Sequence, residues 1–303
     1  MANICIVLNY NDADETIRFC NNLRGYSCID KIVIVDNKST DNSVQRLKSI
    51  ETEKIVLLCA PENKGYAAGN NVGLQYVLEN KYDGNVIISN PDVDIAHEDL
   101  VRILSVLDMD ENIGMSTGLI YTNNRLVSNF GWRVPKAGEL LAHNFFTLHK
   151  LLTILNHSFY LQKDDISRPY LECNCVPGCF FCLRIDVLQK IGLLDERTFL
   201  FGEENILGYQ LWNNGYKTVI STESKVIHHG GHSIKKSRTK KKTTRKYAEN
   251  SLQLYVREYL KCGKTMQIWF HWMFWLAMYE QDCVVIALRF FERLKKKIWR
   301  DVC

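Results

Sequence analysis

Two aspartates, Asp92 and Asp94, provide the first residues with evident chemistry in this 303-residue sequence. They follow the apolar run 85–88, and Pro91 holds Asn90 in an extended conformation before the chain leaves that run. Carboxylates at this spacing suit Mg²⁺ or Mn²⁺ bridging a diphosphate, because hard cations prefer oxygen ligands. The structural alternative is that one aspartate caps the helix expected to follow.

A second acidic pair, Glu203 and Glu204, opens an expected helix directly after the aromatic run 199–202. Apolar neighbours raise the pKa of a carboxyl group, as a general base working near neutral pH requires. First-turn acids also interact favourably with a helix dipole, so the pair has a structural explanation as well.

The glycine-rich stretch 60–73 is expected to turn from a strand into a helix that continues through 74–78. Its glycines, at 65, 69 and 73, would let backbone N–H groups approach an anionic or nucleotide ligand. The spacing matches neither a dinucleotide-binding fingerprint nor a P-loop, and an ordinary glycine turn is the alternative.

A histidine loop, His228–Ser233, offers an imidazole and backbone donors to a phosphate. A basic segment follows at once and contains Lys235, Lys236, Arg238, Lys240, Lys241, Lys242, Arg245 and Lys246. Such a run is either a solvated tail or a cover for a diphosphate leaving group or an anionic acceptor.

Four short apolar runs precede these features, at 3–8, 31–35, 55–59 and 85–88. Each lacks strict alternation and is followed by a helical pattern, which predicts a parallel sheet covered on both faces. Ligands of such sheets bind outside the carboxyl ends of the strands. The polar residues at those ends are Asn9, Tyr10, Asp36, Asn63, Asn90, Asp92 and Asp94. The sequence therefore predicts one site along this edge.

Composition indicates a globular protein, with 46% apolar and 24% charged residues. The 11 cysteines follow no repeating frame, and the first residues read as a strand, so we expect a reduced, cytoplasmic protein. Segments 268–278 and 284–293 predict a pair of apolar C-terminal helices, each too short to span a bilayer. They are expected either at a membrane interface or packed on the catalytic domain or a second subunit, as in a homodimer.

Taken in order, the motifs resemble inverting family-2 glycosyltransferases of the GT-A fold. The resemblance is carried by IVLNYN, IVDNKSTDNS, PENKGYAAGNNVG, SNPDVD, PGCFFCLR, GLLDERTFLFGEENILGYQL, GYK and HHGGHS. It covers residues 3–233 and is strongest to the rhamnosyltransferase-like subgroup that builds bacterial capsule, O-antigen and other surface polysaccharides. It implies an α/β GT-A fold whose mostly parallel sheet is flanked by helices. The catalytic domain would span 1–233, and 234–303 would form a basic and helical extension.

The resemblance implies a role for each matching residue. Asp36 would hold the nucleobase, and Asp92 would match the last acid of the metal motif, with water or Asp94 helping. His228 would lie near the diphosphate and the metal. The implied nucleotide-sugar site comprises Asn9, Tyr10, Asp36, Asn63, Gly65, Asn70, Asn90 and Asp92, and the implied metal site comprises Asp92, Asp94 and His228.

Glu204 stands where the family has the aspartate of its Glu-Asp motif, the catalytic base. Because Glu-Glu replaces Glu-Asp here, either Glu203 or Glu204 remains a candidate for the base. Ile206 stands where many relatives have a further acid, which indicates a different acceptor.

The implied reaction moves rhamnose or a hexose from a dTDP- or UDP-sugar, with Mg²⁺ or Mn²⁺, to a lipid-diphosphate-linked glycan. The expected location is peripheral to the inner face of a bacterial membrane, with no nucleic-acid partner. One alternative is a sugar nucleotidyltransferase, which needs a basic glycine-rich loop near the first strand, whereas 9–14 is neutral to acidic. The other is a non-catalytic sugar-nucleotide-binding module, which would tolerate Ile206.

Overall fold

The computed structural model describes residues 1–155, 157–230 and 241–302, with side chains described as far as Phe291. The first half of the basic segment, up to residue 240, therefore lies outside the described residues. The chain forms two compact units: unit 1 comprises 1–134 and 160–254, and unit 2 comprises 135–159 and 255–303. This division concerns packing, so the catalytic domain expected over 1–233 stays a prediction.

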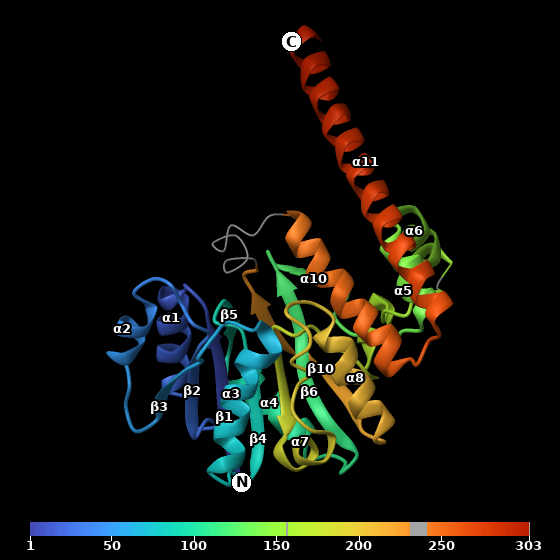
Figure 1. Ribbon diagram of the computed structural model, residues 1–303. Helices are drawn as coiled ribbons and strands as arrows, with labels where there is room; N and C mark the ends of the chain where they lie inside the picture. The colour runs from blue at the N-terminus through green and yellow to red at the C-terminus, as the bar shows by residue number, and fades with distance from the viewer. Residues whose placement is uncertain (156, 231–240, 303) are drawn as a thin grey trace. The chain divides into compact units, whose positions relative to one another are not determined.

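Unit 1 is built on a ten-stranded sheet in the order β3-β2-β1-β4-β9-β6-β10-β5, with β7 paired to β6 and β8 to β10 (Figure 1). The strands are β1 (Ala2–Asn9), β2 (Lys31–Asp36), β3 (Ile55–Cys59), β4 (Gly84–Ser89), β5 (Val93–Ile95), β6 (Ile113–Thr122), β7 (Arg125–Leu126), β8 (Tyr170–Cys173), β9 (Phe180–Arg184) and β10 (Lys217–His228). The first four strands are parallel, as predicted. β9 runs antiparallel between β4 and β6, so the sheet is mixed.

Helices cover both faces of this sheet, which explains why the strands are apolar almost throughout. One face is covered by α1 (Ala13–Arg24), α2 (Ser43–Lys48) and α4 (His97–Val106). The other is covered by α3 (Tyr66–Glu79), α7 (Ile185–Ile191) and α8 (Glu203–Asn213). Unit 1 also contains η1 (Lys163–Ser167) and α10 (Lys241–Leu254). The result is a three-layer α/β/α arrangement that brings the strand ends to one edge.

The glycine-rich stretch differs from the expectation. Helix α3 begins at Tyr66, so Gly69 and Gly73 lie inside the helix and not in a turn before it. A Cβ at Gly73 would lie 2.7 Å from Ile6 Cγ2, and one at Gly69 would lie 2.5 Å from Leu8 Cδ1. These glycines let α3 pack closely on the sheet. Only Gly65, with a φ of 102°, forms the turn itself.

Two strands are unusual in length. β10 is a single long strand with an irregularity between Ser221 and Lys225. β7 has only two residues.

Unit 2 contains α5 (Ala137–Asn144), α6 (Phe146–Ile154), the π-helical turn η2 (Tyr255–Tyr259) and α11 (Lys264–Val302). The predicted pair of C-terminal helices is wrong, because α11 is continuous. Glu280, between the two predicted segments, accepts hydrogen bonds from the N–H groups of Phe146 and Thr147 at the start of α6. No helix among the described residues is both long and apolar enough to cross a membrane.

Candidate active site

The ends of β1 and β2 carry the residues expected to hold a nucleobase. Asn9 Nδ2 donates to Asp36 Oδ2 at 2.8 Å, and Ser39 N donates to Asp36 Oδ1 at 2.8 Å. Thr16 Oγ1 donates in turn to Asn9 Oδ1 at 2.8 Å. Asn9 and Asp36 are fully buried, whereas Tyr10 is partly exposed. The two buried residues therefore form the floor of this region, and Tyr10 lies at its rim.

The turn before α3 is held by an asparagine that the sequence analysis did not single out. Asn37 Nδ2 donates to Asn63 Oδ1 at 3.2 Å and to the Gly65 carbonyl at 3.1 Å. Asn63 Oδ1 also accepts from Gly65 N, so Asn63 and Gly65 lie beside the end of β2 as predicted. Asn70, by contrast, is fully buried inside α3 and donates to the Tyr66 carbonyl. The Asn70 side chain is therefore part of the buried interior around α3 in this structure.

Asp92 faces His228 across β5 and β10. His228 Nε2 lies 3.3 Å from Asp92 Oδ1, and only 7% of the aspartate side chain is exposed. Burial alone would lower the pKa of His228, but its hydrogen bonds with Asp92 and the Cys179 thiol raise that pKa to about 10. The carboxylate and the imidazole therefore form a tight pair at the end of the sheet.

Asp94 has different partners. Its Oδ1 accepts from Arg18 Nη1, and its Oδ2 lies 2.6 Å from His229 Nε2. Burial would raise the pKa of Asp94, but the hydrogen bonds from His229 and Arg18 hold it below the usual value. Both carboxylate oxygens of Asp94 are thus engaged away from the Asp92 and His228 pair.

Glu203 and Glu204 begin α8 immediately after Gly202, which has a left-handed conformation. Burial, together with the charge of Glu204, raises the pKa of Glu203 to about 8. Burial also raises the pKa of Glu204, which accepts a 3.4 Å hydrogen bond from Gly178 N. A cavity of about 10 Å³, roughly the space of one water molecule, lies against both glutamates.

Gly178 and Cys179 connect the two acidic pairs. Gly178 N bonds to Glu204 Oε1, and the Cys179 carbonyl accepts from Asn90 N at 2.8 Å. Tyr66, at the start of α3, donates its hydroxyl to the Gly178 carbonyl at 2.5 Å. The segment between β8 and β9 thus lies beside Asp92, Glu204 and the glycine turn. The structure brings these predicted site residues together at one edge of the sheet.

The residues present offer a partial fit to a divalent cation. Asp92 and His228 supply one carboxylate and one imidazole that already face each other. No group of three or more His, Cys, Asp or Glu residues that could hold a metal occurs among the described residues. A cation here would take its remaining ligands from a diphosphate and water, as Mg²⁺ and Mn²⁺ commonly do.

Sequence reasoning missed Asn37, Gly178 and Arg18. Gly178 lies in the PGC segment before β9, where a proline and a glycine indicate a loop. Asn37 directly follows Asp36 at a strand end, and that position was the available signal. Nothing in the sequence around Arg18 distinguishes it from other helix-surface arginines.

The arrangement of strands and helices is that of the GT-A fold. Solved structures with the same fold include GalNAc-T7 with UDP, GalNAc and Mn²⁺, at a TM-score of 0.62 and 13% identity over 86% of this chain and 49% of that one. The mannosyltransferase PcManGT from Pyrobaculum calidifontis, in complex with GDP-Man and Mn²⁺, matches at 0.57 and 14% identity over 94% and 75% of the two chains. TarS 1-349 from S. aureus, in complex with UDP-GlcNAc, matches at 0.53 and 14% identity over 92% and 73%.

The chain belongs to glycosyl transferase family 2, whose model matches residues 4–192. A curated relative, the low-salt glycan biosynthesis hexosyltransferase Agl10 of Haloferax volcanii, is 23% identical over 199 residues. That match covers 66% of this chain and 58% of the relative. The chain therefore spans little more than half the length of this relative.

Proposed function

We propose that this protein transfers a sugar from a nucleoside-diphosphate sugar to a hydroxyl group of a glycan acceptor, with inversion at the anomeric carbon. The observation that carries the proposal is the juxtaposition of two acidic sites of opposite character, joined by Gly178 and Cys179. Asp92 is paired with an imidazole, whereas Glu204 lies in apolar surroundings that raise its pKa. One site suits a diphosphate with its cation, and the other suits a proton acceptor.

Glu204 is the catalytic base in this proposal. It takes a proton from the acceptor hydroxyl while that oxygen forms a bond to the anomeric carbon, and the bond from that carbon to the diphosphate oxygen breaks on the opposite face. Glu203, with a pKa of about 8, keeps its proton at neutral pH and adds no second negative charge beside the base. The hydrogen bond from Gly178 N, in the segment that also contacts Asn90, supports Glu204 over Glu203 as the base.

Asp92 and His228 would hold Mg²⁺ or Mn²⁺, and a bound cation would supply charge stabilisation for the leaving diphosphate. Holding a cation requires His228 to be neutral, so its binding would release the proton that this histidine otherwise shares with Asp92. Asn63 and Gly65 would position the diphosphate from the side of α3. Asn90 would line the same region through the strand end that precedes Asp92.

The donor in this proposal is a dTDP- or UDP-sugar carrying rhamnose or a hexose. Asn9 and Asp36 would shape the base pocket from below, and Tyr10 would contact the base from the rim. Asn70 would act indirectly, by holding the start of α3. The uracil nucleotides in two of the structural neighbours support a pyrimidine donor, whereas PcManGT was solved with GDP-Man.

The acceptor in this proposal is a lipid-diphosphate-linked glycan of a surface polysaccharide such as capsule or O-antigen, reached at the inner face of the membrane. An apolar stripe on α11 supports this location. Its exposed members, most of them three or four residues apart, are Ile268, Trp269, Trp272, Leu276, Tyr279, Ile286 and Phe290. The opposite face of α11 packs within unit 2 through Phe270, Phe274 and Ala277.

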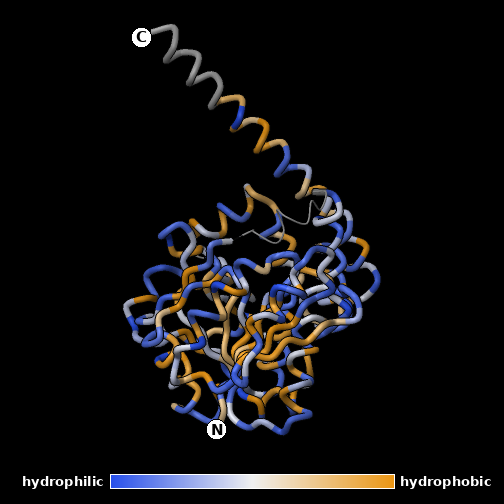
Figure 2. The backbone as a smooth tube through the Cα atoms, turned by 90° about the vertical axis from the view of Figure 1, so that its left-hand side faces the viewer, coloured by the Kyte–Doolittle hydropathy of each residue, from blue (hydrophilic) through white to orange (hydrophobic). Residues whose placement is uncertain are grey.

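Exposed aromatic residues on an amphipathic helix are typical of a membrane interface. Hydrophobic and hydrophilic residues alternate along α11 (Figure 2). Leu151 and Ile154 of α6 are also exposed. The sequence beyond 292 adds a basic cluster that complements anionic lipid. The stripe is therefore the proposed contact with the membrane.

Vesicle flotation tests this contact. The Trp269→Ala/Trp272→Ala variant should bind vesicles containing phosphatidylglycerol at least tenfold more weakly than the wild type does. Trp212→Ala, which removes an exposed tryptophan of unit 1, should bind as the wild type does. The contact would instead be with a second subunit if the wild type bound no vesicles and formed a concentration-dependent dimer that the double variant abolished.

The activity is tested by following the products of a panel of nucleotide sugars with Mn²⁺. Cleavage at the anomeric carbon releases a nucleoside diphosphate, and Glu204→Gln should abolish that release. A nucleotidyltransferase would instead form a sugar 1-phosphate and a nucleoside triphosphate when supplied with diphosphate. A binding module would show a donor-dependent rise in melting temperature without any product.

A further inference from the structure

We propose that Arg18, Asp94 and His229 form a clamp that positions Asp92 and His228, with Asp94 acting as a positioning residue and not as a metal ligand. The inference rests on the proposed role of Asp92 and His228 in binding a cation and a diphosphate. It assigns a function to an acidic residue that the sequence alone pairs with Asp92.

Each partner of Asp94 also reaches the backbone beside Asp92. Arg18 Nη1 donates to Asp94 Oδ1, while its Nη2 lies 3.5 Å from the Pro91 carbonyl. His229 Nε2 lies 2.6 Å from Asp94 Oδ2, while its backbone N–H donates to the Asp92 carbonyl at 2.9 Å. The clamp therefore holds the residues on both sides of the Asp92 and His228 pair.

These polar contacts matter because the strand that they hold, β5, is short. β5 is an edge strand of three residues, and its ladder with β10 consists of Val226 with Ile95, Ile227 with Asp94 and His228 with Val93. A ladder of this length fixes little by itself. Its register decides whether His228 faces Asp92, because a shift of one residue would turn the histidine to the other face.

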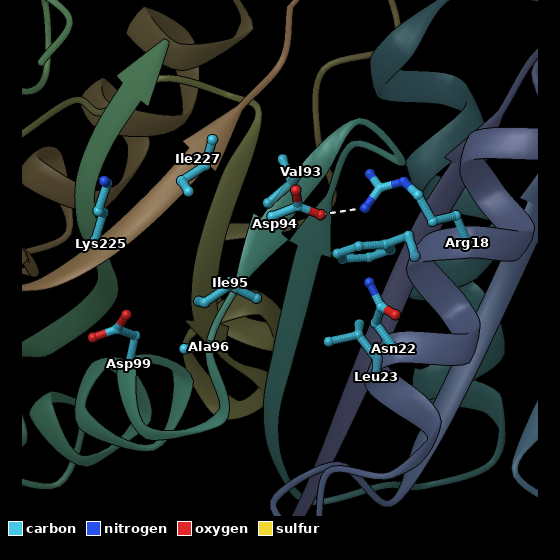
Figure 3. A pocket seen from close by; sticks show the side chains of 11 residues that line it. Arg18, Asn22, Leu23, Val93, Asp94, Ile95, Ala96, Asp99, Lys225 and Ile227 are labelled. Carbon is cyan, nitrogen blue, oxygen red and sulfur yellow. Dashed lines mark hydrogen bonds and ion pairs between the residues drawn. The ribbon is translucent and has the colours of Figure 1, made fainter. Parts of the chain in front are cut away.

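A cavity of about 500 Å³ opens beside this strand. Figure 3 shows Arg18, Asn22 and Leu23 of α1 on one side of it and Val93, Asp94 and Ile95 of β5 on the other, with the Arg18 to Asp94 contact between the two elements. Apolar residues of α1 and β5 pack in one core cluster. The ion pair, and a hydrogen bond from Tyr26 just after α1 to the Ile95 carbonyl, add polar links across this junction.

The clamp and the ligand interpretation predict opposite effects of one substitution. If Asp94 bound the metal, Arg18→Gln would free its carboxylate and would leave metal binding unchanged or tighter. If Asp94 positions Asp92, then Arg18→Gln and Asp94→Asn remove the same structural link. Both substitutions should then weaken metal binding. The double variant should bind the metal no more weakly than the single variant with the lower affinity.

The first experiment measures the binding of Mn²⁺ in the presence of UDP by electron paramagnetic resonance, without turnover. Arg18→Gln and Asp94→Asn should each raise the Kd for Mn²⁺ about tenfold. This is the smaller end of the loss in affinity expected when a residue that orients a metal ligand is removed. Arg18→Lys, which keeps a cation beside Asp94, should restore part of the loss. Asp99→Asn breaks the ion pair of Asp99 with Arg102 at the same cavity and should leave the Kd unchanged. Tighter or unchanged binding in Arg18→Gln would overturn the clamp.

The second experiment needs no metal. Amide hydrogen exchange of a peptide covering 226–230 should be faster in Arg18→Gln and Asp94→Asn than in the wild type and in Asp99→Asn, because His229 N–H loses its fixed acceptor. Unchanged exchange in both variants would also overturn the clamp. If wild-type protein bound no Mn²⁺ with UDP, the metal role in the proposed function would fail, and exchange alone would decide the clamp.

Discussion

The two acidic pairs of the site have the same charge and opposite surroundings. Asp92 and Asp94 each face a histidine of the segment that ends β10, and Asp94 also has an arginine, which together hold its pKa low. Glu203 and Glu204 face apolar side chains, a tyrosine and backbone N–H groups, and burial raises the pKa of both. Arg18 and two histidines face one pair, whereas the cavity beside the other is lined by no lysine, arginine or histidine.

This difference teaches that the number of carboxylates says little about their chemistry. Opposite charges stabilise the ionised form, whereas a low dielectric stabilises the protonated form. The surroundings of Asp92 and Asp94 favour carboxylates beside a diphosphate and its cation. The surroundings of Glu203 and Glu204 favour proton exchange near neutral pH. Four substitutions test this contrast.

Glu204→Gln should have the largest effect, a loss of about 10³-fold in kcat, because the amide cannot accept the acceptor proton. Steady-state release of the nucleoside diphosphate measures it, with the fold checked by circular dichroism. Glu203→Gln should retain most of the activity, since Glu203 is protonated at neutral pH. Loss of activity in Glu203→Gln alone would exchange the roles of the two glutamates.

Asp92→Asn should lower kcat about 10²-fold and raise the Mn²⁺ concentration needed for half-maximal activity, because it removes the only carboxylate that faces His228 in the described part of the chain. A Mn²⁺ titration of the reaction measures both quantities. Asp186→Asn, which breaks the ion pair with Arg184 on the protein surface, is the matched control and should behave as the wild type does. Equal effects of the two substitutions would remove the distinction between Asp92 and other paired aspartates.

Glu203→Gln should stabilise the folded protein as the pH rises. The pKa of Glu203 is raised from 4.5 to about 8, so the folded state binds the proton more tightly than the unfolded state does. The stability associated with that proton is fully present below pH 4.5 and is lost as the pH rises through about 8. Relative to the variant, wild-type protein should therefore lose at most about 1.4 kcal/mol per pH unit across this window.

Urea unfolding at pH 5, 7 and 9 measures that difference. Glu53→Gln, at an exposed glutamate, should show a constant difference from the wild type across the same series. A Glu203→Gln variant that is less stable than the wild type at pH 9 would contradict the apolar surroundings inferred for this pair.

Gly178→Ala should have the smallest effect. A Cβ at this position would lie 3.1 Å from Glu204 Oε1, so the glutamate must shift by a few tenths of an ångström. Misplacement of the base should lower kcat about tenfold or less, with little change in the Mn²⁺ requirement. Gly138→Ala, where nothing lies within 4 Å of the added carbon, should leave kcat unchanged. A selective change in Mn²⁺ affinity would show that Gly178 acts on the Asp92 pair.

Much of the fold follows from local patterns. The runs at 31–35 and 55–59 became β2 and β3 almost unchanged, because buried parallel strands require continuous apolar residues. The polar residues after them lie at one edge, because parallel strands end together. The start of α3 was misjudged, since Gly69 and Gly73 favour a turn locally and are required by the contact of the helix with β1.

The sequence pattern also failed to predict that α11 is one continuous helix. Glu280 and Gln281 look like a break in an apolar pattern, but they bond to Phe146 N and to the Asn144 carbonyl. These partners lie more than 130 residues away in the chain. Local propensity cannot anticipate a polar residue whose partner is supplied by tertiary packing.

The sequence by itself determined the parallel half of the sheet, the edge at which polar residues gather and the identity of the two acidic pairs. These follow from side-chain hydrophobicity and strand direction, which are local properties. The resemblance placed Asp92, Asp94 and His228 in one metal site, and only the tertiary structure decided that Asp94 meets Arg18 and His229 instead. That distinction depends on α1, β5 and β10 meeting at one place, because the charge and hydrogen bonds around a carboxylate come from neighbours that are distant in the chain.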